Sequence, residues 1–310
     1  MGSSQAPLLK KRFYQVKIKN LGVSNLKDLG QFIGQLQRQA FRRAYGKIWD
    51  LTMAEVSTKA IASLTQYYDQ PLRCFTFGDF QLTPTIEEFE EILGCPLGGR
   101  KPYLFSGFYP SLARIFKART LASQDEWAPF IDVLALLIFR VVLFPNMDEL
   151  VDLTVIDAFL AFYDCKESPV VAILADLYDI FDRRCEKNHA RIFCCTPALY
   201  VWLVSHLFRK GERHIFQLEG HRSCAKKKEA NWDQLLASKE RSSVNWFPRW
   251  KEGITDVLIS CGEFPNVPLM GTRGCINYNP VLTIRQLGYP MRGAPVGSSG
   301  LRIIKKGGLN

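Results

Sequence analysis

The 310-residue sequence lacks the motifs that mark the common catalytic centres. It has no Walker phosphate loop, no Gly-x-Gly-x-x-Gly dinucleotide fingerprint, no Gly-x-Ser-x-Gly nucleophile turn and no His-Glu-x-x-His zinc helix. The Asp-Ser/Thr-Gly of retroviral-type proteases is also missing. Acidic residues are frequent, but their spacing gives no reason to select any nuclease-like triad. We therefore predict no catalytic residues, no cofactor and a protein that is not an enzyme.

Long hydrophobic runs are missing as well. The longest candidate, residues 130–144, covers only fifteen positions and contains Asp132 and Arg140. A membrane-spanning helix requires about 20 predominantly apolar residues. We expect a buried central helix instead. Its two charged side chains should reach the surface or a partner, because a lone buried charge is costly.

The nine cysteines show neither a disulfide framework nor a Cys-x-x-Cys pair. The N-terminal residues also lack the apolar core of a secretion signal. We therefore predict an intracellular protein with free or buried thiols. A loose cluster of Cys and His leaves zinc open as an alternative, but its spacing matches no zinc knuckle, so we predict no metal. The cluster comprises Cys185, His189, Cys194, Cys195, His206, His214, His221 and Cys224.

Positive charge is present in excess, and it is distributed unevenly. The formal net charge is +10, and residues 1–50 alone contain ten Lys and Arg against two Asp and Glu. The middle of the chain is neutral to acidic, and residues 201–310 are basic again. This asymmetry is compatible with binding to nucleic acid or another polyanion, and also with ordinary solvated surface charge.

A polar basic segment over residues 209–230 is the candidate binding site. Tryptophans follow it at positions 232, 246 and 250, and nucleic-acid sites combine cations with stacking aromatic rings. The alternative is a solvated loop whose tryptophans pack into the core. Lys226–Lys228 also resembles a nuclear-import patch, so we expect the nucleus rather than the cytoplasm. The candidate nucleic-acid-binding residues are Arg209, Lys210, Arg213, Arg222, Lys226, Lys227 and Lys228.

The most informative segment is residues 74–97, CFTFGDFQLTPTIEEFEEILGCPL. Apolar and aromatic residues on both sides of Gly78–Asp79 predict a small β-hairpin at residues 74–83. Glycine can adopt positive φ without steric cost, so the chain can reverse at Gly78.

A helix should follow this hairpin. Either Thr83 and Pro84 begin it, or a Thr85–Glu88 capping box begins it slightly later. Gly94 supplies a left-handed residue at its end, and Pro96 prevents its continuation.

This hairpin–helix unit resembles the signature of the aminotransferase-like plant mobile domain. Three further stretches resemble an uncharacterised plant branch near that family, and the likeness spans roughly residues 24–291. The stretches are Leu137–Leu150, Asn245–Trp250 and Phe264–Met291. The family is associated with plant transposable elements and with plant proteins domesticated from them. It has no established catalytic residues, so the resemblance implies none here, and it implies no pyridoxal-phosphate chemistry.

The remaining sequence is predominantly helical. Apolar residues at helical spacing predict one helix that ends near Gly46, and its apolar face contains Leu26, Leu29, Ile33, Leu36 and Ala40. Residues 262–278 are rich in Gly and Pro and predict turns with little regular structure. We predict a mainly α fold, α+β at most. A multi-helix globular domain would cover residues 24–291, between a basic segment (1–23) and a flexible Gly/Ser-rich basic tail (292–310).

These expectations lead to a functional hypothesis. We predict an uncharacterised plant protein of transposable-element origin that acts as a non-enzymatic interaction module. Its partners would be protein, nucleic acid or both, with no membrane and no small-molecule substrate. Two alternatives stay open: a remnant nuclease or transposase whose site is assembled from distant acidic residues, and a non-functional element fragment. A pocket that gathers carboxylates or Cys and His side chains would favour the enzyme.

Overall fold

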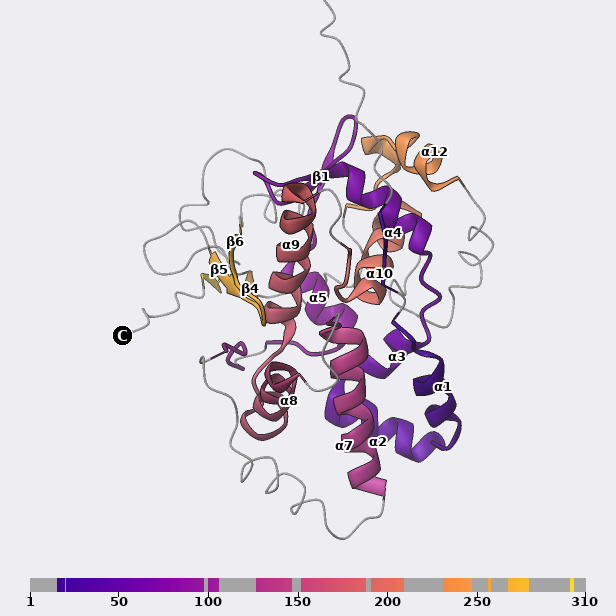
Figure 1. The fold of residues 1–310 in the computed structure, drawn as a ribbon, viewed down its shortest axis with the longest axis vertical. Helices are drawn as coiled ribbons and strands as arrows, with labels where there is room; N and C mark the ends of the chain where they lie inside the picture. Colours follow the sequence, from indigo (N-terminus) through magenta and orange to yellow (C-terminus); the bar gives the residue numbers. More distant parts are fainter. Residues whose placement is uncertain are drawn as a thin grey trace, which may run out of the picture.

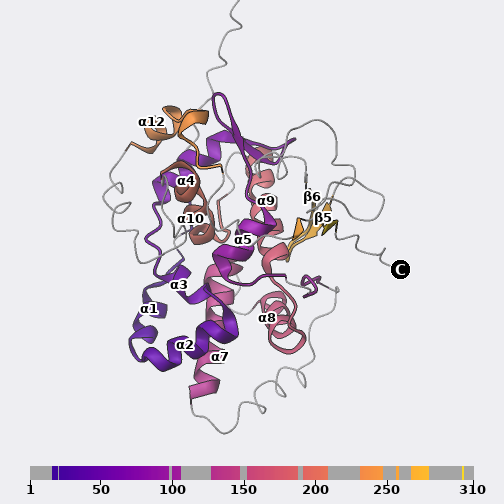
Figure 2. The same cartoon turned by 180° about the vertical axis from the view of Figure 1, so that it is seen from behind.

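The computed structural model describes residues 16–19, 21–97, 100–105, 127–146, 152–187, 191–208, 231–246, 256–257, 267–278 and 302–303. In these ranges the chain is mainly α-helical with three small β-sheets, which confirms the predicted fold class. Helices α5, α9 and α10 lie in the middle of the structure (Figure 1). Helices α4 and α12 lie at one end, and α1 and α2 lie at the other, as the reverse view also shows (Figure 2).

The N-terminal region forms three helices, and the prediction of one continuous helix was wrong. They are α1 (Ser24–Gln31), α2 (Gln35–Tyr45) and α3 (Ile48–Thr52). Gly34 has an extended conformation (φ −73°, ψ 178°), which interrupts the helical hydrogen bonding between α1 and α2. The interruption rotates α2, so Leu36 and Ala40 are exposed, whereas Phe41 and Tyr45 are buried.

A three-stranded antiparallel sheet follows the next helix, and it contains the predicted hairpin. Its elements, in chain order, are α4 (Thr58–Leu64), the 3-10 turn η1 (Thr65–Tyr67), β1 (Tyr68–Asp69), β2 (Cys74–Thr76) and β3 (Gln81–Leu82). Strand β2 lies in the centre, and Phe75 pairs with both Tyr68 and Leu82. The chain reverses near Gly78 without the positive φ that glycine permits, and the residue with positive φ in this region is Arg73, at 48°.

Helix α5 (Ile86–Leu93) begins with the capping box of Thr85 and Glu88, rather than with Thr83 and Pro84. Gly94 ends it in the predicted left-handed conformation, at φ 64°. Lys47 explains this glycine, because its backbone N–H donates to the Leu93 carbonyl at 2.7 Å and its backbone N would lie 2.9 Å from a Cβ at position 94. The helix therefore ends where the α2–α3 connection approaches it closely.

The predicted central helix at residues 130–144 is peripheral on one side. It consists of α7 (Trp127–Ile138) followed by a π-helical turn, η2 (Phe139–Leu143). Val133 is 57% exposed on it, and Asp132 accepts a hydrogen bond from the Tyr45 hydroxyl at 2.5 Å. In the described part of the chain, no helix has the length and apolar character needed to cross a membrane.

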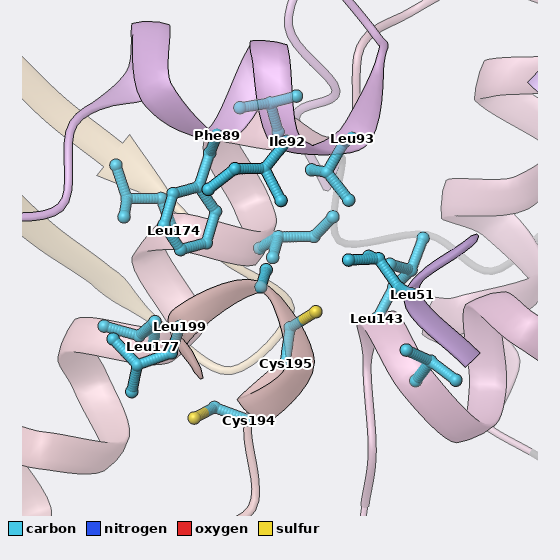
Figure 3. Close-up of a cluster of buried hydrophobic side chains, with 14 of the residues drawn as sticks. Leu51, Phe89, Ile92, Leu93, Leu143, Leu174, Leu177, Cys194, Cys195 and Leu199 are labelled. Carbon is cyan, nitrogen blue, oxygen red and sulfur yellow. The ribbon is translucent and has the colours of Figure 1, made fainter. Parts of the chain in front are cut away.

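The helix that occupies the centre is α10 (Thr196–Leu207), in which every residue is buried. Its neighbours in the sequence are α8 (Leu153–Cys165), α9 (Val170–Glu186), α12 (Trp232–Ala237) and the 3-10 turn η4 (Arg241–Ser243). Phe89 and Ile92 of α5 lie over Leu174 of α9, and Cys195 and Leu199 face them at the start of α10 (Figure 3).

Residues 267–278 contain a β-hairpin, so the prediction of little regular structure at residues 262–278 was wrong there. Strands β5 (Val267–Met270) and β6 (Cys275–Tyr278) pair antiparallel, and β5 lies beside α9. Strand β4 (Asp256–Val257) pairs in parallel with β7 (Arg302–Ile303). Strand β7 falls within the predicted Gly/Ser-rich basic tail at residues 292–310, whose flexibility stays a prediction.

Candidate functional site

A fully buried polar centre surrounds Glu88, and we call the side chains of Thr85, Glu88, Trp202 and His206 the Glu88 centre. Glu88 and His206 are each 1% exposed. One carboxylate oxygen of Glu88 accepts the Thr85 backbone N–H at 3.0 Å and the Trp202 indole N–H at 2.8 Å. The other oxygen lies 2.8 Å from Nε2 of His206. Glu88, a member of the capping box of α5, is thus also a polar contact between α5 and α10.

The hydrogen-bond partners of His206 fix where its protons lie. Nδ1 lies 2.8 Å from the carbonyl oxygen of Asn245, which can only accept, so Nδ1 carries a hydrogen. A single further proton must then lie between Nε2 and Glu88, bound to one of the two. The pair is neutral overall in either arrangement. Burial of one net charge is thereby avoided, which is the condition for stable burial of ionisable groups.

A row of carboxylates along α9 is the second polar feature, and we call Asp176, Asp179 and Asp182 the α9 acidic row. They are spaced three residues apart, so they lie on neighbouring positions of the helix surface. Asp182 accepts from Arg73 Nε at 3.1 Å and from the Tyr68 hydroxyl at 2.8 Å. Asp179 pairs with Arg183 at 2.8 Å. The row therefore binds the β1–β2 region to α9.

Asp176 holds the turn of the β5–β6 hairpin. It accepts the Thr272 backbone N–H at 2.8 Å and the Thr272 hydroxyl at 2.5 Å. Gly271 approaches so closely that a Cβ there would collide with the carboxylate. Burial raises the pKa of Asp176 to about 6, while the Arg273 charge and the Thr272 hydrogen bonds lower it. Arg273 itself donates to the carbonyls of Phe193 and Pro145.

The side chains of both features bind other parts of the chain, unlike those of a reaction centre that is open to a substrate. In both the Glu88 centre and the α9 acidic row, the carboxylates accept hydrogen bonds from the chain or form ion pairs with it. A catalytic group needs a face that a substrate can reach. Sequence inspection missed both features, although the capping-box motif identified Glu88 as a helix-start residue.

The predicted zinc alternative receives no support from the residues that the structure covers. Among them, no group of three or more His, Cys, Asp or Glu side chains could hold a metal ion. Cys194 and Cys195 are buried before α10, where burial raises the pKa of both thiols, that of Cys195 to about 12. Cys185 is exposed on α9, and His206 belongs to the Glu88 centre. His189, His214, His221 and Cys224 lie outside the described residues.

All seven predicted nucleic-acid-binding residues, within 209–228, lie outside the described residues. Two of the tryptophans that were considered with them are described. Trp232 is 2% exposed and packs edge-on against Phe208, with ring centroids 5.4 Å apart. Trp246 is partly buried against Phe80, at 6.0 Å. Both tryptophans pack against the core, so the alternative interpretation was correct for them and a base-stacking role is not available to Trp232.

Comparison with known protein families places the chain in one of them. A family model described as a domain of unknown function, DUF7745, matches residues 26–125 and 115–305. The chain belongs to the DUF7745 family. No match was found among curated proteins or among solved structures. The DUF7745 match covers the hairpin–helix unit, which resembles the plant mobile domain, and the three stretches that resemble a nearby plant branch. The match names neither of them, so both resemblances stay predictions.

Proposed function

We propose that this DUF7745 protein is a non-enzymatic interaction module of plant transposable-element origin, which binds nucleic acid, protein or both and acts in the nucleus. The supporting observation is that the buried ionisable side chains of Glu88, His206 and Asp176 bind other parts of the chain. The resemblance to the plant mobile domain supports the origin. The net charge of +10, which is concentrated at the two ends of the sequence, supports a polyanionic partner.

The nucleic-acid branch predicts that affinity falls as the salt concentration rises. Lys and Arg side chains that bind phosphates release counterions from the nucleic acid, and added salt opposes that release. Fluorescence anisotropy of labelled DNA and RNA, measured with the full chain between low and physiological salt, tests it. Replacement of Lys226, Lys227 and Lys228 by alanine should lower the slope of log affinity against log salt by up to about 3.

A matched control removes three exposed lysines elsewhere, Lys59, Lys101 and Lys187. This variant should change the salt slope much less than the triple variant at 226–228. Absence of salt-sensitive binding by the unmodified chain would remove the nucleic-acid branch and leave the protein-binding branch. Cleavage of the DNA in the presence of Mg²⁺ would instead support the remnant-nuclease alternative.

A further inference from the structure

Helices α1 and α2 form a helix–turn–helix unit at one end of the structure (Figure 1). Only residues 32–34 separate them. Ile33 is buried in this turn at 4% exposure, and the extended Gly34 begins α2. DNA-binding units of this kind join two helices by a turn of three to four residues that often contains glycine, and the second helix enters the major groove.

The position of α2 is fixed from its inner side. Phe41 packs against Tyr45 and Trp49, with ring centroids 5.2 and 6.1 Å away. The Tyr45 hydroxyl donates to Asp132 of α7 at 2.5 Å. Trp49 in turn covers Gly30 of α1, where a Cβ would collide with the indole ring. These contacts hold α1 and α2 against the body of the protein as a preformed unit.

Arg38 fixes the turn between the helices. Its Nε donates to the Ile33 carbonyl at 3.3 Å, and Nη2 donates to the Gly30 carbonyl at 3.4 Å. The Gly30 carbonyl belongs to the last turn of α1, and the Ile33 carbonyl belongs to the turn that follows this helix. The Arg38 guanidinium therefore lies near the negative end of α1, where a cation is favourable, while the side chain remains exposed.

The outer face of α2 has the composition of a nucleic-acid contact surface. The helix sequence, QLQRQAFRRAY, contains three arginines, three glutamines and no acid. Arginine and glutamine bind phosphates and form bidentate hydrogen bonds with base edges. Leu36 of α2 and Phe32 of the preceding turn, at 75% and 71% exposure, offer apolar surface of the kind that contacts thymine methyl groups. The exposed polar residues of α2 are Gln35, Arg38, Gln39, Arg42 and Arg43.

We propose that α2 is a DNA-contacting helix that enters the major groove of double-stranded DNA through this outer face. Duplex DNA is favoured over duplex RNA, because the major groove of A-form RNA is too deep and narrow for side chains to read. The inference rests on the nucleic-acid branch of the proposed function, and it adds a major-groove contact through α2 to the candidate basic residues within 209–228. Helix α2 lies at the opposite end of the structure from α4 and α12 (Figures 1 and 2).

The test uses the full chain, a labelled 30-base-pair DNA duplex and a duplex RNA of the same length, at several salt concentrations. The Arg42→Gln/Arg43→Gln variant should bind DNA about tenfold more weakly, with a smaller salt slope. The control, Lys59→Gln/Arg241→Gln, removes the same charge from exposed residues of α4 and η4, and it should change DNA affinity less than about twofold. Equal circular-dichroism spectra and melting temperatures would show that both variants fold.

A gain-of-function variant separates a direct contact from nonspecific loss of charge. Asp50 binds Arg42 at 2.5 Å, so its carboxylate competes with a phosphate for that guanidinium. Asp50→Asn should strengthen DNA binding about threefold, whereas a binding site elsewhere would leave affinity nearly unchanged.

Three outcomes overturn the inference. DNA binding that is lost in the Lys226–Lys228 alanine variant but retained when α2 is altered refutes α2 as the contact and leaves the nucleic-acid branch standing. Stronger binding of the RNA duplex refutes the major-groove geometry. Absence of binding by the unmodified chain removes this inference together with that branch, and leaves only the protein-binding branch of the proposed function.

Discussion

Helices α10 and α2 are of nearly equal length but occupy opposite environments. Every residue of α10 (Thr196–Leu207) is buried, whereas in α2 (Gln35–Tyr45) Phe41 and Tyr45 are the buried residues. The polar side chains of α10 find partners in the core: Trp202 and His206 bind Glu88, and Ser205 donates to a carbonyl one turn earlier. The arginines of α2 remain at the surface. We infer that substitutions at polar residues of the α5–α10 contact change stability, whereas those on the outer face of α2 change binding.

The largest expected effect is at Glu88. Replacement by alanine removes the acceptor for the Thr85 N–H, the Trp202 indole and the shared proton of His206. Buried donors without partners cost about 1–3 kcal/mol each, and disruption of a buried pair costs about 3–5 kcal/mol. We expect Glu88→Ala to lower the free energy of unfolding by about 4 kcal/mol, measured by urea denaturation.

Two variants sharpen this prediction. Glu88→Gln is nearly isosteric, and its amide NH₂ can donate to Nε2 of a neutral His206 while its oxygen accepts from Trp202. It should therefore cost less than about 1.5 kcal/mol. Glu91→Ala on the same helix removes a pair with Lys47 in which the Glu91 side chain is 42% exposed, and it should cost less than about 1 kcal/mol. Equal losses for Glu88→Gln and Glu88→Ala would contradict the neutral-pair description.

The second prediction concerns the pH dependence that Asp176 produces. Burial raises its folded-state pKa from the ordinary 3.8 to about 6, so its ionised form destabilises the folded state at neutral pH. As pH falls through 6, the folded state binds a proton before the unfolded state does, and this contribution stabilises the protein until both are protonated below about 4. Relative to Asp176→Asn, which cannot titrate, the unmodified protein should gain up to about 3 kcal/mol between pH 7 and pH 4.

The measurement is a series of urea denaturation curves of both proteins across this pH range. Comparison with Asp176→Asn cancels the titration of the other carboxylates, because they are common to both proteins. A stability difference that does not change with pH, or that changes in the opposite direction, would show that the folded-state pKa of Asp176 is not raised. The hairpin turn would then be held by a permanently ionised carboxylate.

The sequence was most informative where structure depends on neighbours along the chain. The hairpin near residue 78, the Thr85–Glu88 capping box and the left-handed Gly94 each depend on a few adjacent residues, and each is present. Even there, tertiary structure modified the result. Positive φ occurs at Arg73 instead of Gly78. The Arg73 side chain binds Asp182 of α9 and the Asn277 carbonyl of β6.

The contacts that were missed join residues far apart in the sequence. Glu88 and His206 are separated by 118 positions, and Asp176 and Thr272 by 96. No local pattern determines which acid meets which donor. The β5–β6 hairpin was missed because Pro268, Gly271 and Gly274 suggested turns, although the strand positions Leu269 and Ile276 are buried. The burial of Leu36 was predicted wrongly because apolar spacing continued across the interruption at Gly34.

The smallest expected effect is at Leu36, and it tests the comparison on its exposed side. Leu36 is 75% exposed, whereas Leu26 of α1 is 4% exposed and belongs to the core. Removal of a buried leucine side chain costs about 2–5 kcal/mol, and surface substitutions usually stay within about 0.5 kcal/mol. Urea denaturation should therefore show a loss of about 3 kcal/mol for Leu26→Ala and less than about 0.5 kcal/mol for Leu36→Ala. A loss of several kcal/mol at Leu36 would mean that this face of α2 is covered in the folded protein, and the helix could not then enter a DNA groove.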